Sequence, residues 1–352
     1  MNSQKLRDLL FEGLVIPAIP LALHADGSFD QRHQKALLRY YIDAGAGGIA
    51  AAVHTTQFEI RQYKSFFENF LSLVSQEIDS YSEKQGRTII KIGGICGPTS
   101  QAVHEAQLLG SKGYDAGLLS LSAFKDKTTE EILTHCREVA GHLPLFGFYL
   151  QPAVGGINLS RKFWKEFARI PNVIGIKVAP FNRYKTLDVM QALAASGRQQ
   201  EVALYTGNDD SIVFDLIADY PFRSPEEKQV QFSGGLLGQW CVWTHQAFLM
   251  LEEIKHLKRS GRDIPKELIE RAHKITDANS AIFDAHTNYA GVIPGVHEIL
   301  RRQGLLSSRR CLDPELDLSD GQMEEIERVL SAYPELQDGS FINAHIDEWL
   351  KE

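Results

Sequence analysis

Lys177 is the residue whose type and surroundings point most directly to chemistry. It follows the apolar run NVIGI at residues 172–176 and precedes Val178 and Ala179. A lysine among apolar residues is partly desolvated, which lowers its pKa and leaves an amine that can attack a carbonyl carbon. The alternative is a lysine that ends a strand and pairs with a neighbouring carboxylate. The first interpretation predicts an imine-forming residue at position 177.

Other reactive side chains end other apolar runs. Tyr149 could act as general acid and base if it lies within hydrogen-bond reach of Lys177, or it is an aromatic rim residue with a solvated hydroxyl. Thr55 and Thr56 could bind a carboxylate through hydroxyl and backbone N–H groups, or they fill a strand as β-branched residues do. His54 suits proton transfer near neutrality, or it is held by packing and one hydrogen bond.

The last two apolar runs end in a polar turn and a glycine pair. Asn208, Asp209 and Asp210 could bind substrate hydroxyls, but an aspartate could instead cap a helix beginning at Ser211. We expect the cap. Gly234 would let a ligand approach the backbone closely, or it would form a tight strand-to-helix turn; we count it among the substrate-binding candidates.

Eight apolar runs rich in valine, isoleucine and glycine must position these residues. Near-continuous apolarity indicates strands buried on both faces, as in a parallel sheet, and segments such as residues 60–74 between them have helical spacing. Eight alternations ending near residue 258 predict a closed (β/α)8 TIM barrel, in which the strand ends meet at one face. A doubly wound open sheet is the rival, but no GxGxxG loop follows the first run. The runs are LVIPAIPLAL, GGIAAAVHTT, TIIKIGGIC, AGLLSLS, PLFGFYLQ, NVIGIKVAP, VALYTGND and VQFSGGLL.

The remainder of the chain shows helical patterns only. We therefore predict a catalytic barrel domain over residues 1–258 and a C-terminal helical domain over residues 259–352. A chain of 352 residues, 43% of them hydrophobic, can fill one barrel and such an extension. The polar segment at residues 220–229 is longer than a typical connection and is predicted to be an exposed loop.

Composition restricts the partners and the compartment. The net charge is −8, and acidic and basic residues are interspersed, so we expect neither nucleic acid nor a membrane as a partner. The four cysteines are far apart, which argues against a disulfide framework and a cysteine zinc site and indicates a cytoplasmic protein. The apolar patch within residues 1–20 is too short and interrupted for a signal peptide or a membrane span.

The order of these motifs resembles the dihydrodipicolinate synthase/N-acetylneuraminate lyase family of class I aldolase-type barrels. The resemblance spans the barrel and, more weakly, the C-terminal helices. Its specific part is the lysine motif with the upstream tyrosine. The matching pieces are Gly13 to Ala18, Asp26 to Asp30, Thr55 with Thr56, Tyr149 to Gly156, and Pro171 to Lys177.

The resemblance implies roles for individual residues. Lys177 would form the Schiff base, Tyr149 would transfer protons, and Thr55 with Thr56 would bind the carboxylate of a pyruvate-type donor. It also implies a small-molecule 2-oxo acid and an aldehyde as partners, and a homo-oligomer, often a tetramer. Neither a cofactor nor a metal is expected, because the covalent imine at Lys177 carries the reaction.

Departures from the family pattern indicate which aldehyde could serve as the acceptor substrate. His54 and Gln57 stand where glycines are usual. Val154 occupies the position of an arginine that binds an acceptor carboxylate in dihydrodipicolinate synthases, and Phe124 occupies that of a tyrosine borrowed from a neighbouring subunit. The sequence therefore predicts that the chain is not a true dihydrodipicolinate synthase. It favours an apolar aldehyde, or a sugar-derived chain held by neutral hydrogen bonds.

Four functions remain to be weighed. The first is a Schiff-base lyase or aldolase that acts on a 2-oxo acid. The second is a Schiff-base dehydratase or hydratase of a deoxy-keto acid, in which His54 or a water supplies the second proton transfer. The third, a non-catalytic keto-acid-binding relative, needs neither Lys177 nor Tyr149. The fourth, a metal-dependent barrel, needs two or three converging ligands, and of 12 histidines only His54 clearly ends a strand.

Overall fold

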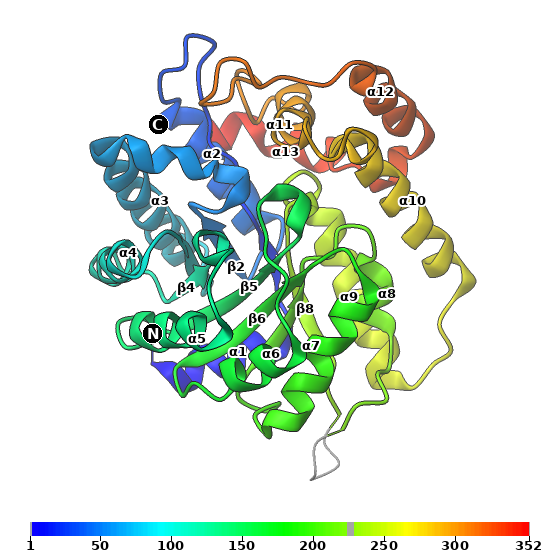
Figure 1. Cartoon of the computed structure of the whole chain (residues 1–352). Helices are drawn as coiled ribbons and strands as arrows, with labels where there is room; N and C mark the ends of the chain where they lie inside the picture. Colours follow the sequence, from blue (N-terminus) through cyan, green and yellow to red (C-terminus); the bar gives the residue numbers. More distant parts are fainter. Residues whose placement is uncertain (1, 224–228, 352) are drawn as a thin grey trace. The chain divides into compact units, whose positions relative to one another are not determined.

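The computed structural model describes residues 2–223 and 229–351 (Figure 1). The strands are β1 Val15–Pro17, β2 Gly48–Ala51, β3 Ile90–Ile95, β4 Ala116–Leu119, β5 Leu145–Leu150, β6 Val173–Ala179, β7 Ala203–Thr206 and β8 Phe232–Leu237. The helices are α1 Ser3–Glu12, α2 Gln31–Asp43, α3 Lys64–Lys84, α4 Thr99–Ser111, α5 Thr129–Ala140, α6 Arg161–Ala168, α7 Arg183–Ser196, α8 Ile212–Ile217, α9 Thr244–Ser260, α10 Lys266–Ile282, α11 Val292–Arg302, α12 Gln322–Ala332 and α13 Gly339–Trp349.

The strands and helices alternate as a (β/α)8 barrel requires, and further helices follow the last strand. The predicted TIM barrel with a C-terminal helical extension is confirmed. Strands β3 to β8 pair in parallel, each with the next along the chain. Of the predicted loop at residues 220–229, residues 224–228 lie outside the described residues.

The chain divides into two compact units. Unit 1 consists of Met1–Leu14 and Ile90–Leu236, and unit 2 of Val15–Ile89 and Leu237–Glu352. Unit 1 therefore holds α1, the strands from β3 onward and α4 to α8, and unit 2 holds β1, β2, α2, α3 and the helices from α9 onward. The predicted domain boundary at residue 258 falls within α9, and that division stays a prediction.

Within unit 1, helix α6 covers one face of β5. Phe163, Trp164 and Phe167 are its buried aromatic residues. They can approach the strand because Gly147 has no side chain: a Cβ there would lie 2.6 Å from Phe167 and 3.1 Å from Trp164. This contact identifies the face of β5 that carries Gly147 as the face turned toward the helices, and the site depends on that assignment.

Helix ends follow local sequence rules in part. The predicted cap at Thr128 is confirmed, because its hydroxyl accepts from the backbone N–H of Glu131 and the Glu131 carboxylate accepts from that of Thr128. The helical spacing predicted from residue 60 becomes α-helical only at Lys64, after the short 3₁₀ segment Phe58–Gln62. The predicted aspartate cap of α8 is wrong, since the capping position is Ser211 and no side chain caps it.

Within unit 2, Asp338 links three helices. Its carboxylate accepts from the Tyr40 hydroxyl at 2.6 Å and from the backbone N–H groups of His245 at 2.8 Å and Gln246 at 3.0 Å. The last two donors begin α9, where a negative charge is favourable. Helix α10 packs against α11 and α12 in the same unit (Figure 1).

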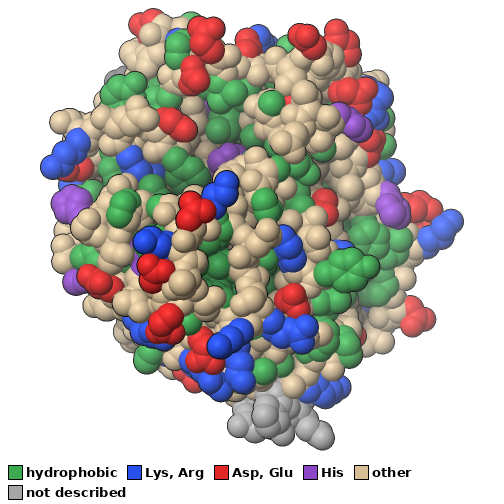
Figure 2. Space-filling view, in the orientation of Figure 1, with side chains coloured by type: hydrophobic (Ala, Val, Ile, Leu, Met, Phe, Trp, Pro, Cys, Tyr) green, Lys and Arg blue, Asp and Glu red, His purple; other side chains and the backbone are tan. Residues whose placement is uncertain are grey.

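The surface carries both signs of charge. On the face shown in Figure 2, acidic and basic side chains are interspersed. Within residues 2–223 and 229–351, no helix combines the length and the apolar character that crossing a bilayer requires.

Candidate active site

Lys177 lies near the end of β6 and is 7% exposed. Burial lowers the pKa of its ammonium group to about 8, and the negative charge of Asp209 acts in the opposite direction. In the part of the chain that the structure describes, no hydrogen bond or salt bridge engages its Nζ. The structure therefore favours a desolvated amine over the alternative of a lysine paired with a carboxylate.

Two neighbours in unit 1 shape the space around the amine. The Nζ atom lies 4.5 Å from the centre of the Phe148 ring, a cation–π contact. Gly207 follows β7, and a Cβ there would lie 2.7 Å from Lys177 Cε and 2.8 Å from Ala179 Cβ. The aliphatic part of the Lys177 side chain therefore lies against the backbone of Gly207, and its amine lies over the Phe148 ring.

Phe146 and Phe148 face the same side of the sheet as Lys177. Phe148 pairs with Lys177 across β5 and β6, and paired residues of adjacent strands point to one face. A Cβ at Gly175, two residues before Lys177, would meet the Phe146 ring at 2.4 Å. The sequence left open which way these two aromatic residues point, and the structure turns both toward the lysine.

Tyr149 lies on the opposite face of β5. It pairs with Val178, its ring lies 5.1 Å from that of Trp164 on α6, and its hydroxyl donates to the Leu159 carbonyl at 3.2 Å. Burial raises its pKa, and the charge of Asp188 adds to that rise. Among the described residues the Tyr149 hydroxyl bonds to the Leu159 backbone and forms no hydrogen bond with Lys177, and its role in proton transfer stays a prediction.

Gly234 has a packing role on β8. A Cβ there would lie 2.4 Å from the Leu14 carbonyl oxygen and 3.0 Å from the Tyr205 ring. The next residue, Gly235, donates its N–H to the same carbonyl at 3.2 Å. The close approach at Gly234 is thus made by the protein's own backbone, and this geometry gives no support to the predicted substrate contact.

A buried polar network fixes the turn after β7. The Asp215 carboxylate accepts from Thr206 Oγ1 at 2.6 Å and Asn208 Nδ2 at 2.9 Å, and it forms an ion pair with Arg183. Asn208 Oδ1 also accepts from the N–H of Phe181, whose φ of +48° is a left-handed conformation. Asn208 therefore positions the chain after β6. The sequence analysis had instead considered Asn208 as a substrate ligand. The sequence analysis missed Asp215, which lies inside a short helix.

Asp209 is buried, whereas the side chain of Asp210 is exposed. Asp209 is 7% exposed and is the group whose charge acts on Lys177. Partial desolvation nevertheless raises the pKa of Asp210, and the nearby charge of Asp215 adds to the rise. Of the polar turn, Asp209 is thus the residue coupled to the amine.

In unit 2, Thr55 and Thr56 form the short 3₁₀ segment that follows β2. Thr55 Oγ1 donates to the carbonyl of Ala18 at 2.8 Å, and Thr56 Oγ1 donates to that of Ile19 at 2.7 Å. Because a hydroxyl has one hydrogen to donate, both are already used within the chain. Carboxylate binding through these residues stays a prediction and would rest on backbone N–H groups.

Gln57 and His54 flank the threonines. Gln57 has a φ of +69°, which favours glycine, and this agrees with the glycine usual at this position in the family that the sequence resembles. Its buried Oε1 accepts from the N–H of Leu312 at 2.7 Å. His54 is half-buried, with its ring 6.0 Å from that of Phe58. A proton-transfer role for His54 stays a prediction.

Phe124 and Val154, the two departures from the family pattern that lie in unit 1, add apolar side chains to it. Phe124 is buried with its ring 4.1 Å from that of His135 on α5, and burial lowers the pKa of His135 to about 4. Val154 is half-buried in the 3₁₀ segment Pro152–Val154. Among the described residues, no three histidine, cysteine or acidic side chains gather as a metal site would need.

Comparison with known proteins places this geometry in a family context. Residues 11–218 match the sequence profile of the Dihydrodipicolinate synthetase family. The 4-hydroxy-tetrahydrodipicolinate synthase of Aromatoleum aromaticum is 26% identical over 196 residues, which are 55% of this chain and 63% of that protein. The match thus spans less than two thirds of that relative's own length.

Solved structures show the same fold. Dihydrodipicolinate synthase from Acinetobacter baumannii, solved with pyruvate, has a TM-score of 0.71 at 20% identity, covering 91% of this chain and 98% of that one. A monomeric dihydrodipicolinate synthase variant has a TM-score of 0.73 at 17% identity, covering 92% and 98%. At these identities the likeness concerns the barrel and its helical extension.

Proposed function

The chain belongs to the dihydrodipicolinate synthetase family, and on that premise we propose that it is a Schiff-base-forming lyase or aldolase. Lys177 condenses with a pyruvate-type 2-oxo acid, and an aldehyde is the second substrate or product. The observation that carries the proposal is the buried Lys177 amine, with its pKa lowered to about 8 and no hydrogen bond or salt bridge among the described residues.

The lowered pKa increases the fraction of Lys177 side chains that are unprotonated and therefore nucleophilic. At pH 7 a group with a pKa of about 8 is unprotonated in about one molecule in ten, against about one in several thousand for an ordinary lysine. The Phe148 ring covers one side of the amine. The free amine adds to C2 of the 2-oxo acid, the carbinolamine loses water, and the protonated imine draws electrons from the adjacent carbon.

Proton transfer in this proposal is assigned to Asp209. Its burial and its charge interaction with Lys177 support that role. The Tyr149 hydroxyl engages Leu159 on the other face of β5, so a relay through Tyr149 would require this strand end to rearrange. A carboxylate could take the proton released when the amine adds and return it when water leaves.

The acceptor in this proposal is an aldehyde without a carboxylate near its carbonyl. Val154 and Phe124 support this, because neither side chain can bind an anion or relay a proton. The activity of a true dihydrodipicolinate synthase is therefore not proposed. A dehydratase would use the same imine and would be separated from a lyase by its products.

Trapping with borohydride tests the imine. We expect the purified protein, incubated with pyruvate and borohydride, to gain the mass of pyruvic acid less one oxygen atom, mapped to Lys177. The Lys177→Ala variant should gain nothing, while Lys162→Ala, which alters an exposed lysine in the same unit, should be trapped normally. Absence of an adduct with pyruvate and with other 2-oxo acids would overturn the proposal.

Two variants separate the candidates for proton transfer. Asp209→Asn should retain trapping but lose turnover with aldehydes, because the imine can form slowly without a base. Tyr149→Phe should retain both activities. The opposite pattern would assign proton transfer to Tyr149 and would contradict the role given to Asp209.

A further inference from the structure

Two serine hydroxyls lie together at the end of β4 in unit 1. Ser120 follows the strand directly and is 3% exposed, whereas Ser122 begins the 3₁₀ segment Ser122–Phe124 and is exposed. Their Oγ atoms lie 3.1 Å apart and share one hydrogen bond, and among the described residues neither hydroxyl makes another. Because each hydroxyl has one hydrogen to donate, one hydrogen of the pair stays available to a ligand, together with lone pairs that can accept.

The register of the strands places Ser120 on the face that carries Lys177. Leu118 pairs with Phe146 across β4 and β5. Ser120 lies two residues after Leu118, and its backbone N–H continues the ladder to β3. Since alternate residues of a strand share a face, Ser120 and Phe148 form the next pair along the two strands. Phe148 in turn pairs with Lys177 on β6.

Phe148 therefore lies between the hydroxyl pair and the amine. Neighbouring strands are about 4.8 Å apart, so the Cα atoms of Ser120 and Lys177 are about 10 Å apart. The Phe148 ring, whose centre lies 4.5 Å from Lys177 Nζ, forms the surface between the two polar groups. A short carbon chain that starts at an imine on Lys177 can cross this ring and meet the hydroxyls on its far side.

The pair suits a neutral hydroxyl group. A serine hydroxyl both donates and accepts, which complements an alcohol, and it carries no charge to compensate a carboxylate. Ser122 also lies beside the turn after β5, since a Cβ on Gly155 would lie 3.8 Å from its Oγ. That turn contains Val154, which stands where dihydrodipicolinate synthases have an arginine. Neutral donors thus adjoin the place where the charged group is missing.

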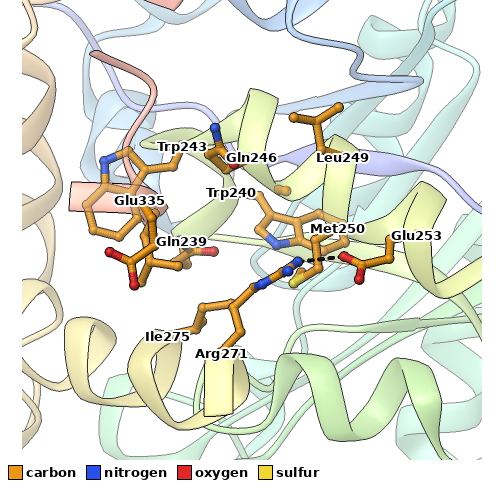
Figure 3. Close-up of a pocket in the computed structure, with 12 residues that line it drawn as sticks. Gln239, Trp240, Trp243, Gln246, Leu249, Met250, Glu253, Arg271, Ile275 and Glu335 are labelled. Carbon is orange, nitrogen blue, oxygen red and sulfur yellow. Dashed lines mark hydrogen bonds and ion pairs between the residues drawn. The ribbon is translucent and has the colours of Figure 1, made fainter. Parts of the chain in front are cut away.

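A cavity in unit 2 offers no comparable group. It has a volume of about 300 Å³, and Arg271 and Glu335 are among the residues that line it. Figure 3 shows Arg271 turned toward Glu253, to which it donates at 2.7 Å. Glu335 pairs with Lys274 at 2.6 Å. These charged groups already bind one another, whereas the hydroxyl pair in unit 1 keeps a hydrogen to donate.

We propose that Ser120 and Ser122 bind a hydroxyl group next to the carbonyl group of the aldehyde substrate. The aldehyde is therefore a short hydroxyaldehyde. Of the two acceptors that the sequence favours, this is the one held by neutral hydrogen bonds. The inference rests on the proposed function, because it assigns the second substrate of the reaction that begins at Lys177. The two serines bind substrate and take no part in bond formation.

Two aldehydes of equal size test the assignment. Glycolaldehyde and propanal carry a hydroxyl and a methyl group, respectively, on the carbon next to the carbonyl. With pyruvate as the second substrate, the wild type should have a kcat/KM for glycolaldehyde about fivefold above that for propanal, the preference expected from one neutral hydrogen bond. Ser120→Ala and Ser122→Ala should each lower this ratio toward one, and Ser122→Thr, which keeps the hydroxyl, should retain it.

Ser111→Ala is the matched control. Ser111 is an exposed serine of unit 1 that ends α4, before β4, whereas the hydroxyl pair follows that strand. The ratio of the two kcat/KM values should not change in this variant. Because the two aldehydes are compared within each variant, a partial loss of folded protein lowers both values equally and leaves the ratio unaltered.

Pyruvate trapping of the same samples separates this inference from the proposed function. A missing adduct in the wild type would overturn both. An adduct combined with an equal or higher kcat/KM for propanal would overturn the inference alone, and so would a ratio that stays unchanged in both alanine variants. An equal fall for both aldehydes in those variants would mean that the pair binds the reacting oxygen atom, which would contradict its assignment to the neighbouring hydroxyl.

Discussion

Replacing Lys177 by methionine is expected to make the folded protein more stable. Folding moves the Lys177 ammonium from water into a buried site, and its pKa falls from 10.5 to about 8. Each pKa unit corresponds to about 1.4 kcal/mol, so the charged lysine costs about 3 kcal/mol of folding free energy at pH 7. Methionine has a similar length, carries no charge and can pack on the Phe148 ring.

The effect has a defined pH dependence. The folded lysine releases its proton near pH 8, whereas the unfolded one keeps it until about pH 10.5. The unfolded state therefore binds more protons in this window, and the stability of the wild type rises with pH across it. Lys177→Met should gain about 3 kcal/mol in free energy of unfolding at pH 7, and this gain should fall toward zero by about pH 10.5.

Urea unfolding followed by far-ultraviolet circular dichroism, repeated from pH 7 to 10.5, measures both quantities. Lys162→Met serves as the control, because Lys162 is exposed and its replacement should change stability by less than about 0.5 kcal/mol. If Lys177→Met were less stable than the wild type, or if its gain did not vary with pH, the amine would not be desolvated, and the argument for its reactivity would fail.

Substitutions at three further positions test the supporting structure. Tyr149→Phe should lose about 1 kcal/mol of stability with its backbone hydrogen bonds, and pyruvate trapping should continue at the wild-type rate. Asp215→Asn should cost about 1–2 kcal/mol in urea unfolding, because it removes a buried charged acceptor from Thr206, Asn208 and Arg183, whose side chain is 42% exposed, and no change would contradict a structural role for this carboxylate. Gln57→Ala should destabilise by about 1–2 kcal/mol through loss of the bond to Leu312, and Gln57→Gly by less, because glycine relieves the left-handed backbone; the reverse order would contradict a strained Gln57.

The fold was predictable because its signals are local and repeated. Runs such as NVIGIKVAP are apolar on both faces, which predicts buried parallel strands, and the capping box at Thr128 marks a helix start by sequence alone. The end of the second strand was less predictable. The run continues to Thr56, but the strand ends at Ala51 and Ala52 takes a φ of +58°. A polar turn within an apolar run has no periodicity that would reveal it.

The site was predictable only where one residue carried the signal. Burial of Lys177 follows from its own strand, and the structure agrees. The contacts of Asn208 with Asp215 and Phe181 depend on how three segments pack, and residue type alone suggested a ligand or a cap. The role of Gly234 likewise depends on Leu14, a residue more than two hundred positions away.

The register of β5 against β6 decides which aromatic side chain faces the lysine. Leu145 pairs with Val173, and continuing that register would place Tyr149 opposite Lys177. The register instead shifts by one residue after Leu145, so that Phe146 pairs with Gly175 and Phe148 with Lys177. A shift of one residue exchanges the two faces of a strand. One irregularity thus puts a phenyl ring beside the amine and a phenol beside Trp164 on α6, and for this reason the proposed mechanism assigns proton transfer to Asp209.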